Sequence, residues 1–365
     1  MAKFTEVFED ATKVGKKIPT SEYLTTGKYP IIDQGQNHIS GYTDKEEGLF
    51  ENVPVVIFGD HTRVVKYIDK PFFLGADGVK VLKAKVDDAN YKYLYYALSS
   101  AKIPDTGYNR HFKWLKEIYI PNHSSLEQKQ IVEKLDKVSL LIEQRKEQIS
   151  KLDELVKARF VEMFGDLVFG DKYSDNKCKI GNIASVTKLA GFEFTKYIQY
   201  KEEGDIIMLR GLNCKKGHLI LDDIKWIDKE TSDLLPRSKL YYGDILMTYA
   251  GTIGDVAMVD SDNKYHLAPN VAKITLHDKE TCNPLFLIHL FMYSHDYIMT
   301  FASQVAQASI NMEKIRNFEY FFPPIELQNE FATFVKQIDK SKFEVQQSLE
   351  KLETLKKSLM QQYFG

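Results

Sequence analysis

The sequence predicts an α+β protein in which two globular domains of similar fold alternate with two long antiparallel helices that form a coiled coil. Three observations predict this arrangement. The chain has 365 residues, enough for two or three domains. A long amphipathic segment in the middle is repeated at the end of the chain, at an offset of 200 residues. The segments that precede the two copies share short landmarks in the same order.

The composition is that of a folded protein with packed cores. Hydrophobic residues make up 44% of the chain and aromatic residues 12%, which is untypical of disorder. The formal net charge of -2 argues against a non-specific nucleic-acid binder, but it leaves room for a local basic groove.

Cysteines and apolar runs indicate the compartment. Cys178, Cys214 and Cys282 are too far apart for a metal-spaced pair or a disulfide framework, so we expect a reducing cytoplasm and no metal. The start, MAKFTEVFED, is too acidic for a signal peptide. The longest apolar run, 283–294, is too short to span a bilayer, so we expect no membrane partner.

The repeat is clearest where each long segment closes. Residues 150–165 read SKLDELVKARFVEMFG, and residues 350–365 read EKLETLKKSLMQQYFG. Apolar positions recur in alternating steps of four and three from 131 to 163 and again from 331 to 363, which is the 3.5-residue period of a coiled coil. Pro121 and Pro323–Pro324 bound the segments upstream. We therefore expect spacer helices at 124–165 and 325–365, each about 60 Å long.

Four charged residues interrupt the apolar seams: Arg145 and Arg159 in the first, and Lys342 and Lys356 in the second. A buried cation needs a partner or must extend to water. Either these positions lie at the margins of a wide interface, or they help to fix register and orientation.

The globular segments 1–123 and 166–324 share landmarks in one order with different spacing. The sequence pairs 29–35 with 205–211, 55–59 with 245–249, 77–81 with 270–274, 93–98 with 286–290, and 115–118 with 315–318. Short strand-like runs separated by turn residues, with one or two helices, predict an α+β domain in each segment.

Several strings resemble the specificity subunits of type I restriction-modification systems: DILM at 244–247, GTIG at 251–254, LAPN at 267–270, LEQKQIV at 126–132 and LQNEF at 327–331. The order domain, helix, domain, helix is also similar to that family, although the first domain matches its strings more loosely. The resemblance implies a first target-recognition domain at 1–123, a central spacer helix at 124–165, a second target-recognition domain at 166–324 and a C-terminal spacer helix at 325–365.

The resemblance also implies a function without catalysis. Each target-recognition domain reads one half of a bipartite, asymmetric double-stranded DNA target. The helices act as a ruler and dock two methyltransferase (modification) subunits, which restriction or translocase subunits join. No cofactor is implied for this chain. A protein with two DNA-recognition domains sets the distance between half-sites by its own geometry, which is consistent with a bipartite target.

The candidate DNA contacts are polar side chains in three loops that recur in both halves. Arginine and lysine suit guanine, asparagine and glutamine suit adenine, and lysine, arginine and small donors suit phosphates. Each residue alone could instead form a turn or lie on an ordinary surface, so the prediction rests on the loops as groups. The candidates are Gln34, Gln36, Asn37, His38, His61, Thr62, Arg63, Asn109, Arg110 and His111 in the first half, and Arg210, Asn213, Lys215, Lys216, Tyr249, Thr252, Ser309 and Asn311 in the second.

Other functions have weaker support in the sequence. Asn283-Pro284-Leu285-Phe286 resembles the catalytic motif of amino-methyltransferases, but Leu285 replaces a proline and no glycine-rich cofactor loop precedes it; a helix start explains the run as well. No acidic constellation indicates a nuclease, and Gly251–Gly254 lacks the end of a phosphate loop. A structural coiled-coil adaptor would explain the helices but not the duplicated polar loops.

Overall fold

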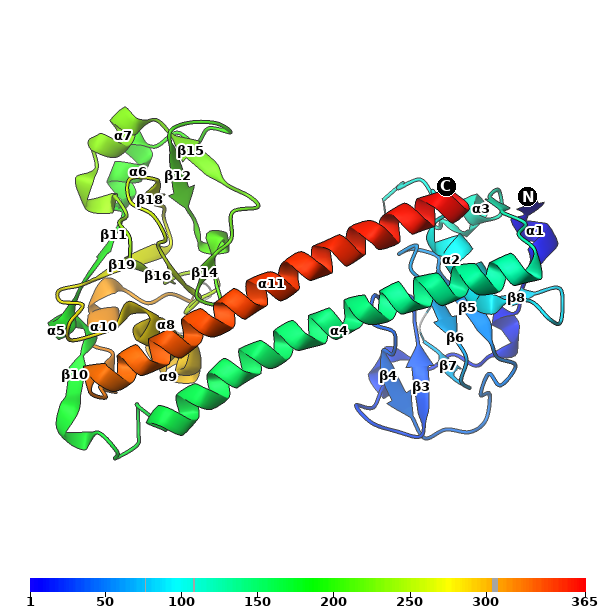
Figure 1. Cartoon of the computed structure of the whole chain (residues 1–365), viewed down its shortest axis with the longest axis horizontal. Helices are drawn as coiled ribbons and strands as arrows, with labels where there is room; N and C mark the ends of the chain where they lie inside the picture. The colour runs from blue at the N-terminus through cyan, green and yellow to red at the C-terminus, as the bar shows by residue number, and fades with distance from the viewer. Residues whose placement is uncertain (76, 108, 304–307) are drawn as a thin grey trace. The chain divides into compact units, whose positions relative to one another are not determined.

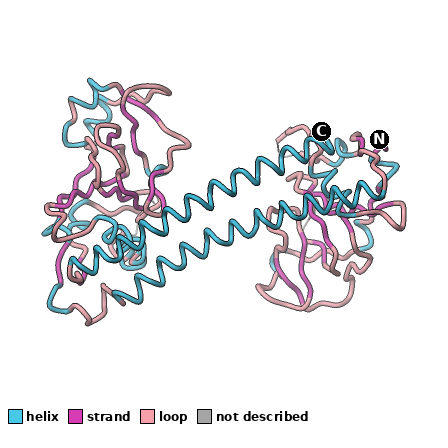
Figure 2. The backbone as a smooth tube through the Cα atoms, viewed as in Figure 1, coloured by secondary structure: helices cyan, strands magenta, loops and turns pink. Residues whose placement is uncertain are grey.

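The computed structural model describes residues 1–75, 77–107, 109–303 and 308–365, which divide into two compact units (Figure 1). Unit 1 comprises Met1–Glu147 and Gln346–Gly365, and unit 2 comprises Gln148–Val345. Each unit therefore contains one globular segment and one half of each long helix. Outside those helices, each unit is mostly strand and loop (Figure 2).

Unit 1 is built on a four-stranded sheet with the order β2-β8-β5-β6 and a three-stranded sheet with the order β4-β3-β7. A short β1-β9 pair brings the start of the chain to the segment before the first long helix. The strands are β1 (Ala2–Lys3), β2 (Phe8–Asp10), β3 (Tyr29–Ile32), β4 (Gly41–Thr43), β5 (Val55–Gly59), β6 (Val65–Ile68), β7 (Phe73–Leu74), β8 (Val79–Ala84) and β9 (Tyr119–Ile120). The short helices are α1 (Phe4–Val7), α2 (Tyr91–Ser99) and α3 (Phe112–Leu115).

Unit 2 repeats this plan with the sheets β11-β19-β16-β17 and β15-β12-β18, and with the pair β10-β20. A hairpin, β13-β14, is added after β12. The strands are β10 (Lys177–Lys179), β11 (Ala184–Lys188), β12 (Ile206–Leu209), β13 (Cys214–Lys215), β14 (His218–Leu219), β15 (Lys225–Ile227), β16 (Ile245–Thr248), β17 (Val256–Met258), β18 (Tyr265–Leu267), β19 (Val271–Leu276) and β20 (Glu319–Phe321). The short helices are α5 (Ile180–Ile183), α6 (Gly191–Tyr197), α7 (Lys229–Asp233), α8 (Pro284–Tyr293), α9 (His295–Met299) and α10 (Met312–Arg316).

The same topology in both units confirms the α+β class and the order of the paired landmarks. In each three-stranded sheet the central strand has one antiparallel and one parallel neighbour. The structure shifts the predicted alignment by one residue, so that Gly78 corresponds to Asn270. Both have positive φ, 95° and 66°, and their carbonyls accept equivalent bonds, from Asp60 N at 2.7 Å and from Tyr249 N at 2.9 Å. Glycine and asparagine are the residues that tolerate this left-handed conformation.

The long helices are α4 (Ser125–Phe164) and α11 (Ile325–Phe364), each of 40 residues, which confirms the predicted pair. Their starts are alike. Gln128 Nε2 donates to the carbonyl of His123 at 2.9 Å, and Gln328 Nε2 donates to that of Pro323 at 2.8 Å. In α4, Ser124 and Glu127 also form a capping box, which satisfies amides that the first turn leaves unpaired.

Within each unit the two long helices pack in opposite directions. In unit 1, Ile131 and Leu135 near the start of α4 join the core that contacts Leu359 and Tyr363 near the end of α11. In unit 2 the end of α4 packs against the start of α11 (Figure 1). The predicted seam is wrong in its last turns: Phe160 and Phe164 are buried there rather than positions 159 and 163, because their rings also pack on Phe286 of α8.

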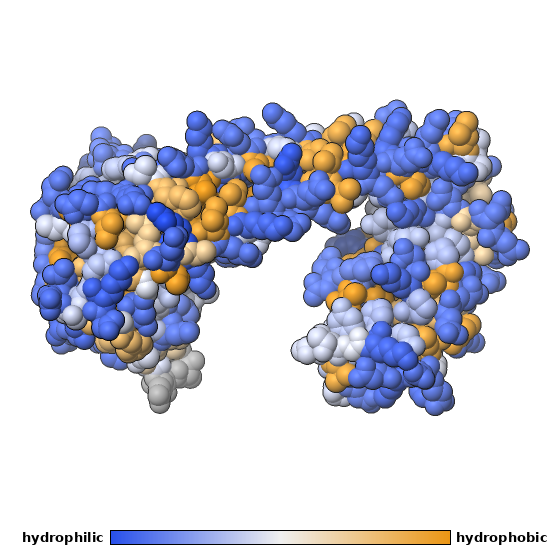
Figure 3. Space-filling view, turned by 60° about the horizontal axis from the view of Figure 1, so that its bottom comes forward, coloured by the Kyte–Doolittle hydropathy of each residue, from blue (hydrophilic) through white to orange (hydrophobic). Residues whose placement is uncertain are grey.

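Two of the charged interruptions form ion pairs across the helix pair. Arg159 contacts Glu330 at 2.9 Å, and Lys342 contacts Asp153 at 2.6 Å. Both cations are partly exposed, so they lie at the margin of the interface and also select matching partners. Such pairs add little to stability, and their main effect is on register. On the face drawn in Figure 3 the surface is mostly hydrophilic, with apolar groups interspersed over the helices.

Candidate nucleic-acid interface

In unit 1 the candidate side chains lie in three connected loops: loop A (33–40) after β3, loop B (60–64) between β5 and β6, and loop C (101–111, of which 108 lies outside the described residues) after α2. Gln34 connects loop A to loop B and to Asp77. Its Nε2 donates to the carbonyl of Asp77 at 3.1 Å, its Oε1 accepts from His61 N at 3.1 Å, and its own carbonyl accepts from Thr62 Oγ1 at 2.6 Å. Both ends of the Gln34 amide are therefore used within the protein.

Loops B and C are connected by Arg63 and Asp60. Arg63 has a positive φ of 61°, and its guanidinium donates to Asp105 at 2.7 Å and to the Ile103 carbonyl at 3.3 Å. The carbonyl of Asp60 accepts from the backbone of His111 at 2.7 Å. The loops thus border one shallow cavity of about 320 Å³, whose lining includes Gln36, Thr62 and Arg63.

Unit 2 gathers its candidates in the corresponding places: loop A (210–224), loop B (249–255) and loop C (300–311, of which 304–307 lie outside the described residues). Loop A carries the β13–β14 hairpin, whose two-residue turn has positive φ at Lys216 and Gly217, as a type I′ turn requires. Lys215 and Lys216 are exposed on this hairpin. Arg210, at the start of the loop, donates to the Asp223 carboxylate at 2.7 Å.

Loop B of unit 2 is longer than its counterpart by two residues. Arg63 N donates to Gly59 O at 2.8 Å, whereas Gly254 N donates to Thr248 O at 2.9 Å. Loops B and C of unit 2 then meet in a bridge between Ala250 and Ser309. The two units therefore present loops of different length and sequence on one scaffold.

Two of the predicted contact residues are buried in the structure. His111 and Asn213 are 1% and 0% exposed, so neither side chain reaches a ligand in this conformation. His111 contacts the Asp60 carbonyl through Nδ1 at 3.1 Å, and the Asn213 amide is fully used inside loop A of unit 2. Both residues hold loops in place.

The other candidates differ in exposure. Gln36, Asn37, His38, Thr62, Asn109, Arg110, Lys215, Lys216, Thr252 and Asn311 are exposed, while Gln34, His61, Arg63, Arg210, Tyr249 and Ser309 are partly buried. Asn311 also caps α10, because its Oδ1 accepts from Lys314 N at 2.8 Å. The structure adds Lys66, which the sequence prediction missed. Its side chain is 4% exposed, and its Nζ donates to backbone carbonyls of loop A of unit 1 from the protein interior.

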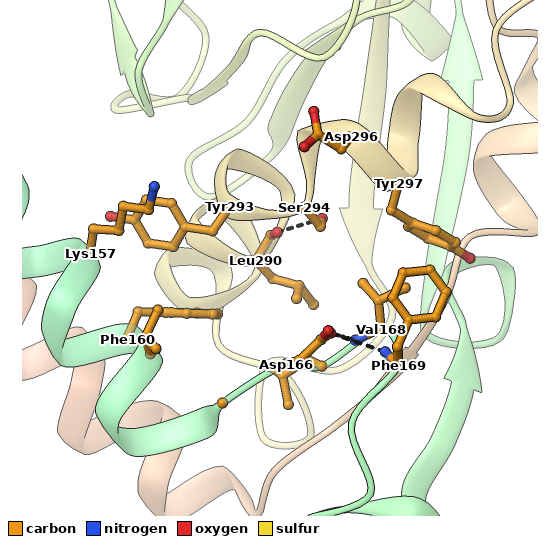
Figure 4. A pocket seen from close by; sticks show the side chains of 13 residues that line it. Lys157, Phe160, Asp166, Val168, Phe169, Leu290, Tyr293, Ser294, Asp296 and Tyr297 are labelled. Atoms are coloured by element: carbon orange, nitrogen blue, oxygen red, sulfur yellow. Dashed lines mark hydrogen bonds between the residues drawn. The ribbon is translucent and has the colours of Figure 1, made fainter.

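A separate cavity of about 350 Å³ in unit 2 lies between the end of α4, the segment after it and the α8–α9 junction (Figure 4). Phe160, Leu290 and Tyr293 give it apolar walls. Its Asp166 carboxylate accepts from the backbone of Val168 at 2.8 Å and Phe169 at 3.0 Å, so it closes the turn after α4. The polar loops lie outside this cavity's lining.

The motif considered for a methyltransferase forms a helix cap. Asn283 Oδ1 accepts from Leu285 N at 2.9 Å at the start of α8, and Asn283 Nδ2 donates to Asn329 at 2.7 Å. Among the residues that the structure describes, no group of three or more His, Cys, Asp or Glu side chains is arranged to hold a metal ion. In the same part of the chain, no helix combines the length and apolar character needed to cross a bilayer.

Two copies of one α+β fold, each with its own set of polar loops, define a protein with two separate recognition surfaces on a single chain. The chain belongs to the family of the type I restriction modification DNA specificity domain, whose model matches residues 1–152 and 176–356. The first stretch contains the whole of one globular segment, the second contains most of the other, and each contains most of one long helix.

Individual relatives agree with this family. The type I restriction enzyme EcoBI specificity subunit of Escherichia coli is 25% identical over 350 residues, which cover 86% of this chain and 73% of that protein. The EcoR124I/EcoR124II specificity subunit of the same organism is 28% identical over 147 residues, 37% of this chain and 36% of that protein.

Solved structures show the same fold over the whole chain. The S subunit of a type I restriction-modification system from M. genitalium aligns with a TM-score of 0.60 at 17% identity, covering 100% of this chain and 95% of that one. A chain from a structural study of complex assembly in the type I R-M system aligns with a TM-score of 0.57 at 13% identity, covering 100% of this chain and 96% of that one.

Proposed function

We propose that this chain is the non-catalytic DNA-recognition subunit of a type I restriction-modification complex and reads a bipartite, asymmetric target in double-stranded DNA. The observation that carries the proposal is the duplicated fold with unlike loops. Loops A, B and C recur at equivalent places in both units but differ in length and in their exposed side chains. Two unlike reading surfaces on one chain suit two unlike half-sites.

In this proposal the target-recognition domains are residues 1–123 and 166–324, and the spacer helices are 124–165 and 325–365. Each spacer helix contributes to both compact units, so that the length of the helix pair sets the gap between half-sites. A helix of 40 residues is about 60 Å long, enough to separate sites one turn of DNA, about 34 Å, apart.

We further propose that the helices dock two copies of a methyltransferase subunit, with restriction or translocase subunits joining in the cytoplasm. Two identical partners need two similar surfaces, and the final turns of the helices supply them. Leu155 and Leu355 occupy equivalent positions and are 47% and 46% exposed. Lys157 and Lys357, two residues further on, are also exposed. Core packing does not explain why the same residue types occur at these equivalent positions, because the side chains are exposed to solvent.

Arg210→Ala is expected to weaken binding of the complete target about tenfold or more through the half-site read by unit 2 alone, since a bidentate base contact contributes about 1–3 kcal/mol. Gln34→Ala should weaken the other half-site instead by releasing loop B, because the Gln34 amide bonds to Asp77 and to the backbone of His61. Titrations would use duplexes in which either half-site is scrambled, at low and high salt, because specific contacts survive salt that abolishes phosphate-only binding.

Arg237→Ala is the matched control, since Arg237 is exposed in unit 2 but lies outside the three loops. Equal losses at both half-sites would contradict independent reading surfaces. A wild-type chain whose binding vanishes at high salt without sequence preference would instead favour the coiled-coil adaptor.

Leu155→Asp and Leu355→Asp are each expected to remove one of two methyltransferase copies, because a carboxylate replaces an apolar contact at the centre of the surface. Size-exclusion chromatography with light scattering would measure the ratio of subunits. Leu126→Asp is the control, because Leu126 is 67% exposed on α4 without a leucine at the equivalent position of α11. An unchanged two-to-one ratio in both variants would contradict this docking surface.

A further inference from the structure

Lys66 of β6 is a nearly buried lysine beneath loop A of unit 1. It is 4% exposed, and its Nζ lies 2.8 Å from the carbonyl oxygen of Asp33 and 2.6 Å from that of Asn37. The Asp33 carboxylate lies 3.8 Å from the same ammonium. One side chain thus holds both ends of the stretch 33–37.

The chemistry of this site explains why a lysine is tolerated there. Burial lowers the pKa of Lys66, and the charge of Asp33 opposes that lowering. A buried cation without partners would be costly, so the two carbonyls and the carboxylate are what make the position possible. In turn, the ammonium fixes the backbone from which the exposed Gln36 and Asn37 project.

In unit 2 the comparable support comes from within loop A itself, from Asn213, and its chemistry is different. Its side chain is 0% exposed; Oδ1 accepts from Arg210 N at 3.0 Å, and Nδ2 donates to the carbonyls of Ile220 at 2.7 Å and Asp223 at 2.9 Å. These bonds join the start of loop A to its far end, across the β13–β14 hairpin. In each unit, one buried polar side chain therefore joins separate parts of loop A by hydrogen bonds.

We propose that Lys66 and Asn213 are positioning residues for specificity: neither contacts DNA, and each fixes loop A of its own unit so that the exposed side chains meet base edges in one arrangement. This inference rests on the proposed function. A loop that is already ordered loses less conformational entropy on binding, and the geometry of its side chains is more selective. Because the hydrogen bonds of Lys66 and Asn213 belong to different units and differ in chemistry, loss of either side chain should affect one half-site only.

The test compares Lys66→Met and Asn213→Leu in the full chain, with duplexes that carry the wild-type target or single-base changes in either half-site. Lys66→Met is expected to weaken binding about tenfold or more and to flatten base preference in the unit 1 half-site only. Asn213→Leu should do so in the unit 2 half-site only. The slope of affinity against salt should not change, because no phosphate contact is removed. Hydrogen exchange should accelerate in 33–40 and in 210–224, respectively.

Two further variants separate positioning from general damage. Lys66→Arg keeps the cation and has room beside a cleft of about 780 Å³ that Lys66 lines, so its base preference should remain close to wild type. Lys80→Met removes a lysine that pairs with Asp10 at 3.1 Å, away from loop A, and should leave both half-sites unaffected.

Unchanged base preference in Lys66→Met and Asn213→Leu would overturn the inference, whatever happens to their stability. Loss of preference at both half-sites in either variant would overturn it too, because that outcome indicates general unfolding. If the wild-type chain itself shows no base preference, the proposed function fails, which is a distinguishable result.

Discussion

Phe331→Ala is expected to lower the free energy of unfolding of unit 2 by about 3–5 kcal/mol. Phe331 of α11 is 0% exposed, and its ring centroid lies 5.3 Å from that of Phe160 and 5.6 Å from that of Phe164 in α4. His289 of α8 lies on another side at 5.2 Å. Truncation would leave a cavity where both long helices meet the globular segment, and rigid neighbours on every side would fill little of it.

Urea denaturation followed by circular dichroism would measure this loss. Phe343→Ala is the matched control: Phe343 lies on the same helix but is 63% exposed, so its removal should change stability by less than about 0.5 kcal/mol. Similar effects of the two substitutions would show that the helix pair does not form the core described for unit 2.

The long helices were the most predictable part of the molecule. The heptad period, the upstream prolines and the closing glycines gave 124–165 and 325–365, and the structure has helices at Ser125–Phe164 and Ile325–Phe364. These signals are local, so the sequence alone contains them. The pairing of the globular segments was also recognisable, because equivalent strands need similar apolar runs.

The seam was less predictable near the end of α4. A strict 3.5-residue period points to positions 159 and 163, but Phe160 and Phe164 are the buried residues. An ideal helix drifts relative to that period, and the third partner, Phe286 of α8, lies more than a hundred residues away in sequence. Contacts at such separations leave no local signal.

The roles of single loop residues could not be predicted for a similar reason. Asn213 and Lys215 lie close together in one polar loop. Asn213 nevertheless points inward, because its amide donates hydrogen bonds to the carbonyls of Ile220 and Asp223. Lys66 sits in a short strand, where a lysine ordinarily faces water, and loop A covers it. Hydrogen-bond partners that fold back from elsewhere decide which polar residue is a contact and which is a support.

Lengthening both spacer helices is expected to move the DNA gap that the chain accepts. Inserting seven helix-forming residues after Glu147 and seven after Val345 places the additions where the chain passes between compact units, so the contacts within each unit are kept. Seven residues preserve the heptad phase and add about 10.5 Å of helix. At about 3.4 Å per base pair, the preferred gap should grow by up to roughly three base pairs.

The most direct test of the ruler is therefore to measure the affinity of the wild-type and lengthened chains for duplexes whose half-sites are identical and whose gap varies in single base-pair steps. We expect each half-site to be read with the same base preference in both chains, while the best gap becomes longer in the lengthened chain. A lengthened chain that folds, keeps both base preferences and still favours the wild-type gap would contradict the proposal that the helix pair sets the distance.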